Sequence, residues 1–387
     1  MAIDLELTAE QAQVRELAHR FAVAEMRPQA ADLDERAAVP WGRSCAAPID
    51  SESGPARAYR PCTGGGGLDP VSMLILGEEL AWGDAGMAVS IMASGLAATA
   101  ILAMGTESQR ARYRGVLCDA ETLHLGALGL LEPDSGSDAL ALGTRAIAVE
   151  DGWSLTGTKQ FCTNGGIADL QVVFATTDPA AGPAGIAAFV VERGNSGMRQ
   201  GRKERKLGVR ASHTAQVLLD DCRVATDARL GWSPDGEAVG PGAAGALGIA
   251  RAAYEFALDY AQTRLQFGRP IARHQAIAFK LADMATEIDA ARLLAWQAGW
   301  MVEQGHPMTR GEGSMAKLFA GDVAMRVTVE AVQVLGGYGY TKEYPVERWM
   351  RDAKIYQIWE GTAKIQGLVI SRLLGEERRA TGAPVAR

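Results

Sequence analysis

The chain has 387 residues, of which 48% are hydrophobic and 22% charged, as in soluble globular proteins. This length exceeds what one ordinary core accommodates, so we expect two or three domains. The net charge of −7 argues against a general affinity for nucleic acid or for an anionic membrane surface.

Two further features bear on the compartment. The N-terminus MAIDLELTAEQ is acidic and lacks an apolar core, so we expect no signal peptide, and we expect no membrane-spanning run. The cysteines number five, and no two of them form a CxxC pair: Cys45, Cys62, Cys118, Cys162 and Cys222. This odd, scattered set predicts neither a disulfide framework nor a metal site. We expect a cytoplasmic protein.

The first third of the chain carries a helical pattern. The first helix runs from Thr8 to about Met26, and Thr8 and Gln11 have the spacing of a capping box. The apolar segments 72–84 and 93–105 continue as helices. We therefore expect an N-terminal all-α domain over residues 1–119.

The period changes between about residues 120 and 228. Short apolar runs there alternate with turn residues: HLGALGLL, WSLTGTKQF, LQVVFATTD, IAAFVVERG and AQVLLDDCRV. Five to seven such strands predict a small antiparallel barrel or sandwich, and we place this domain, taken as a β-barrel, at residues 120–230.

The helical period returns from about residue 242. It marks three long stretches, around Leu247–Ala261, Ile277–Ala295 and 313–337. Together with the helix that follows Glu360, they predict an antiparallel four-helix bundle in a C-terminal domain at residues 231–387. The fold class is thus multidomain α+β, with helices, a small β-domain and then a helical bundle.

One carboxylate stands out near the end of the chain. Glu360 lies in IYQIWEGTAKIQ, among apolar neighbours such as Trp359. An acid in such surroundings is disfavoured as an anion unless something pairs it, and its pKa tends to rise, which makes it a usable base. The same residues also fit a plain helix N-terminus, opened by Glu360 before the run AKIQGLVISRLL.

Four motifs in this architecture resemble those of the acyl-CoA dehydrogenase family of flavoproteins. They are LEPDSGSD at 131–138, GTKQFCTNGG at 157–166, TRLQFGRPIARHQAIAFKLADM at 263–284, and QVLGGYGYTKEYPVERWMRDAKIYQIWEGT at 333–362. The resemblance extends from about Leu7 to Leu374. It implies FAD-dependent oxidation of an acyl-CoA thioester to the trans-2-enoyl-CoA, with the electrons passed to an electron-transfer flavoprotein.

The resemblance also implies roles for single residues. Glu360 aligns with the base that removes the α-proton, and flavin N5 would accept the β-hydride. Substrate contacts would come from Ser137, Trp359 and Gly361. The flavin would be held by Leu131, Gly136, Ser137, Phe161, Cys162, Thr163 and Thr362. The FAD of a neighbouring subunit would be contacted by Arg264, Phe267, Gln275, Gln333, Gly336 and Gly337. A shared site of this kind implies a homo-oligomer, usually a dimer of dimers.

The residues alone leave simpler interpretations open at two of these motifs. Gly, Ser and Asp in EPDSGSD are ordinary residues of β-turns, and Arg264 alone resembles a solvated charge at a helix end. Guanidinium groups at such positions also pair well with pyrophosphate.

The sequence departs from the family pattern in three places. Leu131 stands where the family has a flavin-facing Thr and offers no hydroxyl. The stretch between Pro40 and Thr63 has no usable period and reads either as an irregular loop or as a compensated frame shift. The segment between Cys222 and Phe267 lacks the LDxGR element that touches acyl-CoA. We therefore expect a more open cavity, a weaker grip on CoA, and high mobility at residues 42–62.

Two other functions fit the same fold. One is an acyl-CoA oxidase or another flavin enzyme, and the other is a mainly structural subunit of a hetero-oligomeric dehydrogenase. Retention of Glu360 argues against monooxygenase relatives, which abstract no α-proton. Retention of both Glu360 and the Arg264–Phe267 element argues against a structural subunit.

Overall fold

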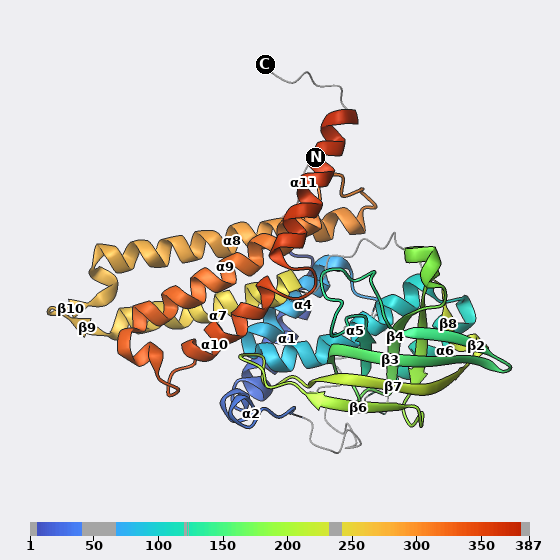
Figure 1. Ribbon diagram of the computed structural model, residues 1–387. Helices are drawn as coiled ribbons and strands as arrows, with labels where there is room; N and C mark the ends of the chain where they lie inside the picture. The colour runs from blue at the N-terminus through green and yellow to red at the C-terminus, as the bar shows by residue number, and fades with distance from the viewer. Residues whose placement is uncertain (1–5, 41–66, 120–121, 123, 232–241, 381–387) are drawn as a thin grey trace.

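The computed structural model describes residues 6–40, 67–119, 122, 124–231 and 242–380. Helices form both ends of the chain and strands form its middle (Figure 1). The expectations for residues 42–62 and for the altered segment around residue 240 concern positions outside these ranges.

The N-terminal helices begin as the sequence predicts. Thr8 and Gln11 form the capping box of α1, with each side chain accepting from the other's backbone N–H. Asp69 and Asp84 cap the next two long helices by accepting from Ser72 N–H and Met87 N–H. The helical elements are α1 (Ala9–Phe21), a π-turn (Ala22–Met26), α2 (Ala30–Arg36), α4 (Pro70–Gly83), α5 (Ala85–Met104) and α6 (Glu107–Leu117).

One of these helices corrects an expectation from the sequence. Helix α5 has 20 residues and a mean hydropathy of 1.9, so its length and composition alone would allow it to cross a membrane. The prediction that no segment is long and apolar enough to span a membrane was therefore wrong. The fold accounts for this composition, because α5 is half-buried and packs against α4, α6 and β1.

The strands in the middle of the chain form one sheet, in the order β6-β7-β3-β2-β4-β5-β8, with β1 pairing with β4. They are β1 (Gly126–Gly129), β2 (Arg145–Val149), β3 (Gly152–Thr163), β4 (Leu170–Thr176), β5 (Ile186–Glu192), β6 (Met198–Lys203), β7 (Thr214–Ala225) and β8 (Arg229–Leu230). The pairs β1–β4 and β2–β4 are parallel, so the sheet is mixed and not purely antiparallel as predicted. The strands β6 and β8 are its two edges and do not pair with each other. The described strands therefore form an open sheet, and the predicted closed barrel is not observed.

Three strands of the sheet, β2, β6 and β8, escaped the sequence-based prediction for physical reasons. The side chains of β6 are partly or fully exposed along its whole length, and in β2 only Ala146 is buried. The strand β6 lies at an edge of the sheet and carries polar residues on both faces, so it lacks the alternation that marks a half-buried strand. The strand β2 lies inside the sheet, but its short apolar run is mostly exposed and shows no alternation either, and β8 has only two residues. The predicted runs, in contrast, became β1, β3, β4, β5 and β7.

The C-terminal part is helical, as predicted. Its elements are α7 (Gly242–Thr263), a short hairpin of β9 (Leu265–Gln266) and β10 (Arg269–Pro270), α8 (Gln275–Glu303), α9 (Glu312–Leu335), α10 (Val346–Ala353) and α11 (Ala363–Ala380). Helices α7, α8 and α9 pack together, and α4 packs against α7 and α8. Helix α11 contacts α9 but extends away from the bundle (Figure 1), and none of its side chains described up to Arg379 is buried. It is thus a peripheral helix rather than the fourth member of the core.

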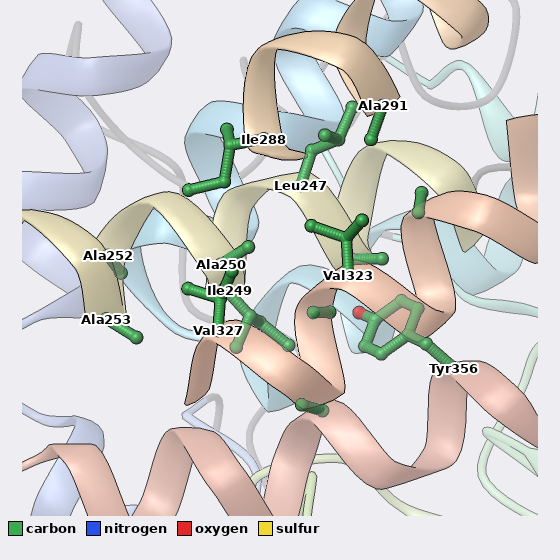
Figure 2. Packing of buried hydrophobic residues seen from close by; sticks show 14 of the residues in the cluster. Leu247, Ile249, Ala250, Ala252, Ala253, Ile288, Ala291, Val323, Val327 and Tyr356 are labelled. Atoms are coloured by element: carbon green, nitrogen blue, oxygen red, sulfur yellow. The ribbon is translucent and has the colours of Figure 1, made fainter. Parts of the chain in front are cut away.

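The main hydrophobic core lies among these helices, and Figure 2 shows part of it. Small residues on α7, such as Ala250 and Ala253, let it pack closely against larger side chains from α8 and α9. Gly248 has the same effect on the side facing α4, because a Cβ atom there would lie 2.2 Å from the carbonyl oxygen of Glu78. This tight packing holds α7 against α4, and the candidate site lies at the Gly242 end of α7.

Candidate active site

Three residues that the sequence singled out share an uncommon backbone conformation. Among the described residues other than glycine, only seven have a positive φ angle, and Phe161, Phe267 and Glu360 are three of them, with φ of 55°, 52° and 51°. Such angles cost of order 1 to 3 kcal/mol for a residue with a side chain, and they cluster at functional sites. Four residues without a predicted role share this conformation, so the strain supports these three positions only together with the motifs.

Glu360 lies between two helical elements, the 3-10 turn Lys354–Gln357 and α11. Its carboxylate approaches the first residue of α7: a Cβ atom at Gly242 would lie 2.6 Å from Oε2. The backbone N–H of Gly242 acts on this carboxylate as a hydrogen-bond donor. The positive end of the α7 dipole thus faces an anion, a favourable arrangement.

Lys317 of α9 completes the surroundings of Glu360. It is 6% exposed, and its Nζ donates to the carbonyl oxygens of Trp359 at 2.6 Å and Gly361 at 2.7 Å. One ammonium group thus bonds to the backbone on both sides of Glu360. The aliphatic part of Lys317 lies on the same side, since Cε would be 3.7 Å from a Cβ at Gly242.

These contacts set the acidity of Glu360. Desolvation of its carboxyl group raises the pKa above the ordinary value, and the charge of Lys317 and the Gly242 N–H oppose this rise. The residue as a whole is nevertheless exposed. A carboxylate with a raised pKa in an exposed residue can act as a general base.

The other predicted contacts of this region lie beside Glu360 in the chain. Trp359 packs edge-to-face on Tyr356, with ring centroids 5.1 Å apart, and its indole Nε1 is buried without a hydrogen-bond partner. Gly361 has a φ of 81°, and its carbonyl oxygen accepts from Lys317. The hydroxyl of Thr362 accepts from the backbone N–H of Ile365 and so caps α11. The helix N-terminus that the residues alone suggested is therefore real and coexists with the candidate base.

The loop 131–138 is held from beneath by a buried ion pair. Lys159 of β3 donates to Glu132 Oε1 at 2.6 Å and to the Leu130 carbonyl at 3.1 Å, and its side chain is completely buried. Desolvation acts against ionisation of Glu132, but hydrogen bonds from Lys159 and Thr144 keep its pKa below the usual value. The ion pair and these hydrogen bonds fix the base of the loop, while Gly136 and Ser137 at its tip are exposed.

The end of β3 lies against the same loop. The backbone N–H of Gln160 donates to the Leu131 carbonyl at 2.8 Å, which brings Leu131 next to Phe161 in the neighbouring strand. Phe161 is 60% exposed at an irregularity of the β3–β7 pairing, and Thr163 is partly exposed. Cys162 points the other way, into the core of the β-domain, and burial raises its thiol pKa to about 12. Any cofactor contact of Cys162 would therefore come from its backbone.

A second group of predicted residues lines a cavity of about 710 Å³ at the far end of the bundle. Arg264 and Phe267 border it from the hairpin after α7, and Gly336 and Gly337 border it from the end of α9. Phe267 is 93% exposed, and a Cβ atom at either glycine would meet open space. Gln275 and Gln333 are exposed beside this region but do not line the cavity.

The two groups of residues do not meet within one chain. Gly242 lies against Glu360 and Arg264 follows the last residue of α7, so the 22 residues of this helix separate them by about 30 Å. Figure 1 shows the same separation, with the β9–β10 hairpin at the end of the bundle away from the β-domain. The structure thus brings together the loop 131–138 and the end of β3, and separately the residues of the cavity.

Several residues of these sites were not recognised from the sequence. Gly242 and Lys317 lie in helical stretches whose pattern predicts only packing, and the contact between each and Glu360 is tertiary. His274 and Tyr338 line the cavity, and the Arg264 guanidinium lies 5.4 Å from the Tyr338 ring centroid. A lysine within the apolar run SMAKLFAG was the one available signal, because a buried lysine requires partners. Among the described residues, no group of three or more His, Cys, Asp or Glu is placed to hold a metal ion.

Comparison with known families gives three matches along the chain. Residues 8–121, 127–222 and 241–375 match family models described as the N-terminal, middle and C-terminal domains of acyl-CoA dehydrogenase. Together these segments span most of the described structure.

Individual relatives and solved structures agree with this match. A short-chain specific acyl-CoA dehydrogenase of Megasphaera elsdenii is 45% identical over 79% of this chain and 82% of its own length. The butyryl-CoA dehydrogenase structure from the same organism has a TM-score of 0.87 at 39% identity, covering 96% of this chain and 100% of that one. A structure described as the electron transferring flavoprotein of Acidaminococcus fermentans contains a chain that matches with a TM-score of 0.87 and 38% identity. The match covers 96% of this chain and 99% of that one.

Proposed function

The chain belongs to the acyl-CoA dehydrogenase family, and from this premise we propose that Glu360 is its catalytic base and short-chain acyl-CoA thioesters are its substrates. The enzyme dehydrogenates acyl-CoA thioesters. The observation that carries the assignment of the base is the surroundings of Glu360: a partly desolvated carboxylate with a raised pKa, held beside Lys317 and the N-terminus of α7.

The chemistry of the step follows from these surroundings. A proton α to a thioester carbonyl is weakly acidic, so its removal needs a carboxylate that is both basic and positioned. Glu360 takes this proton and becomes neutral, and the electron pair of the broken C–H bond enters the new Cα=Cβ double bond. The β-carbon loses a hydride at the same time. FAD, when bound, supplies the two-electron acceptor for that hydride.

The residues present fit an FAD molecule. The loop 131–138 and the exposed end of β3 form a surface with a glycine at its tip and backbone groups available to polar ring edges, which suits a flat ring. Leu131, Gly136, Ser137, Phe161, Cys162 (through its backbone), Thr163 and Thr362 would hold the flavin end. Because Leu131 has no hydroxyl, this end has one side-chain hydrogen bond fewer than a threonine would provide.

The cavity at the far end of the bundle fits the adenosine pyrophosphate part of FAD. Arg264 provides a guanidinium for the phosphates, and Gly336 and Gly337 leave room for close approach. Because about 30 Å of α7 separates Arg264 from Glu360 in one chain, the cavity of one subunit would serve the flavin site of another. Gln275 and Gln333, beside the cavity, would join this intersubunit contact.

We infer from this separation that the enzyme is a homo-oligomer, organised as a dimer of dimers. Exposed apolar side chains support assembly, since Phe267, Phe279 and Leu368 are each more than 60% exposed. Phe267 lies at the cavity, Phe279 lies on α8, and Leu368 lies on the peripheral helix α11.

The preference for short acyl chains and the choice of electron acceptor rest on the relatives. The Megasphaera elsdenii proteins are named as short-chain specific and butyryl-CoA dehydrogenases, and one structural neighbour is described as an electron transferring flavoprotein. We therefore propose that electrons leave this enzyme through an electron-transfer flavoprotein. Trp359, Gly361 and Ser137 would border the thioester.

The experiment that tests this function is anaerobic titration of the purified FAD-bound protein with acyl-CoA thioesters of increasing length, including branched and cyclic ones. We expect loss of the flavin absorbance near stoichiometry with butyryl-CoA, and turnover with an electron-transfer flavoprotein but not with oxygen. Equal reduction by long or branched thioesters would contradict the proposed chain length. Rapid reoxidation by oxygen with peroxide release would identify an acyl-CoA oxidase instead.

A further inference from the structure

The backbone at Glu360 is held in a strained form by a contact that proton transfer itself does not require. Glu360 has a φ of 51°, a region that residues with side chains occupy only when their surroundings impose it. The two carbonyl groups that flank Glu360 both accept hydrogen bonds from Nζ of Lys317. The turn therefore cannot relax without breaking both bonds and leaving a buried ammonium without these acceptors.

We propose that Lys317 is a positioning residue for the catalytic base: its ammonium group fixes the left-handed turn at Glu360, holds the carboxylate against the N-terminus of α7, and keeps it ionised. This inference rests on the proposed role of Glu360. It assigns Lys317 no contact with the reacting atoms.

The groups around Lys317 support an electrostatic role as well as a structural one. Desolvation lowers the pKa of Lys317, while Glu360 and Asp322 raise it, so both carboxylates favour the charged form. Asp322 is in turn held by Gln357, whose Nε2 donates to Oδ1 at 2.6 Å. The buried Tyr356 lies nearby, and the Gly242 N–H faces the carboxylate from α7. Lys317 is thus a cation between two acids, and its charge opposes protonation of Glu360.

Replacement of Lys317 by methionine, which is apolar and similar in length, removes both the charge and the two hydrogen bonds. Without the opposing charge, the pKa of Glu360 rises further. The acidic limb, meaning the pH range in which the rate of flavin reduction falls as Glu360 becomes protonated, should therefore move to higher pH by about one unit. A misplaced carboxylate should also slow flavin reduction by about 10- to 100-fold at its optimum. The dissociation constant for butyryl-CoA and the FAD content should not change.

Two further variants separate this role from a general effect on folding. Lys317→Arg keeps the charge and the donors, and it should keep the acidic limb at its wild-type pH. Lys206→Met removes a partly buried lysine, which donates to the Ser212 carbonyl at 2.5 Å and is not among the groups acting on Glu360. This control should lower thermal stability without moving the limb.

The measurement is the rate of flavin reduction by butyryl-CoA in an anaerobic stopped-flow instrument from pH 5 to 9, for each FAD-bound variant. An acidic limb of Lys317→Met that coincides with those of wild type and Lys206→Met would overturn the proposal. Glu360→Gln, measured in parallel, distinguishes the two possible failures. Full activity of that variant refutes the base itself, whereas its inactivity together with an unmoved Lys317→Met limb refutes only the positioning role.

Discussion

Gly242 and Glu360, 118 positions apart in the sequence, are in direct contact, because the site of a Cβ atom on Gly242 lies 2.6 Å from Oε2 of Glu360. The first turn of α7 and the candidate base therefore share one small volume. A side chain at residue 242 cannot enter it unless the carboxylate moves. The position of the base can therefore be tested by a substitution at Gly242, without changing Glu360 itself.

Gly242→Ala should displace the carboxylate while leaving the fold intact. The clashing atom is the end of a flexible side chain, so the clash should cost little stability, and alanine is itself a good helix former. A displacement of about 1 Å at a reacting group can reduce a rate by about 100-fold. We expect flavin reduction by butyryl-CoA to slow by about 10- to 100-fold, with an unchanged melting temperature.

The matched control is Gly115→Ala on α6, where an added Cβ atom meets no other atom within 4 Å. Its reduction rate should equal that of wild type. An undiminished rate in Gly242→Ala would mean that Glu360 has room to move, and that its observed position does not matter for the reaction.

Arg264→Ala tests the shared cofactor site. Removal of the guanidinium from the cavity should weaken FAD binding by about 10- to 100-fold, as for loss of a hydrogen bond to a charged group. The oligomer should weaken with it, because the bound cofactor would bridge two subunits. Sedimentation velocity, recorded at both protein and flavin wavelengths, measures the two effects together.

Arg326→Ala serves as the control, since its guanidinium pairs with Glu287 of α8 on the bundle surface and does not line the cavity. That variant should sediment as wild type does. A monomeric Arg264→Ala protein carrying one FAD per chain would refute the shared site.

A pH dependence of stability should arise at Asp352, in α10. Burial and the nearby charge of Asp84 raise the pKa of Asp352 to about 7. In the unfolded chain an aspartate has a pKa of about 3.9, so the folded state holds more protons between these values. Stability should therefore fall as the pH rises from about 4 to 7, by at most about 1.4 kcal/mol per unit, and then level off.

Asp352→Asn removes this titration and keeps the acceptor for the Val209 N–H, which donates to Oδ1 at 2.5 Å. Denaturant unfolding at several pH values should give a flatter profile for this variant than for wild type. Asp259→Asn, at an exposed position on α7, should leave the slope as it is. Identical slopes in wild type and Asp352→Asn would exclude Asp352 as the source.

The sequence predicted much of this fold because its signals are local. The capping box at Thr8, the helical period of α7 to α9 and five strand-like runs each depend on residues close together in the chain. The open sheet could not be predicted in this way, since closure depends on whether β6 and β8 meet, and the run patterns carry no information on this. The apolar helix α5 was missed as a possible membrane span, although its composition was visible in the sequence.

For the candidate site, too, residues in local motifs could be predicted and residues brought together by tertiary packing could not. The motifs, through the family resemblance, predicted roles for Glu360, the loop 131–138 and the two ends of the cofactor region. Lys317 and Gly242 meet Glu360 only through the packing of α9 and α7, so no local pattern could connect them. The buried support of the loop by Lys159 and Glu132 likewise joins residues 27 positions apart.

The central claim is that Glu360 removes the α-proton, and Glu360→Gln tests it most directly. The amide has nearly the same shape but cannot accept the proton, so the variant should keep its fold and FAD. In single-turnover mixing with butyryl-CoA, we expect flavin reduction to slow by at least about 1,000-fold, a loss at the level that general-base catalysis supplies. A rate within tenfold of wild type would contradict the account.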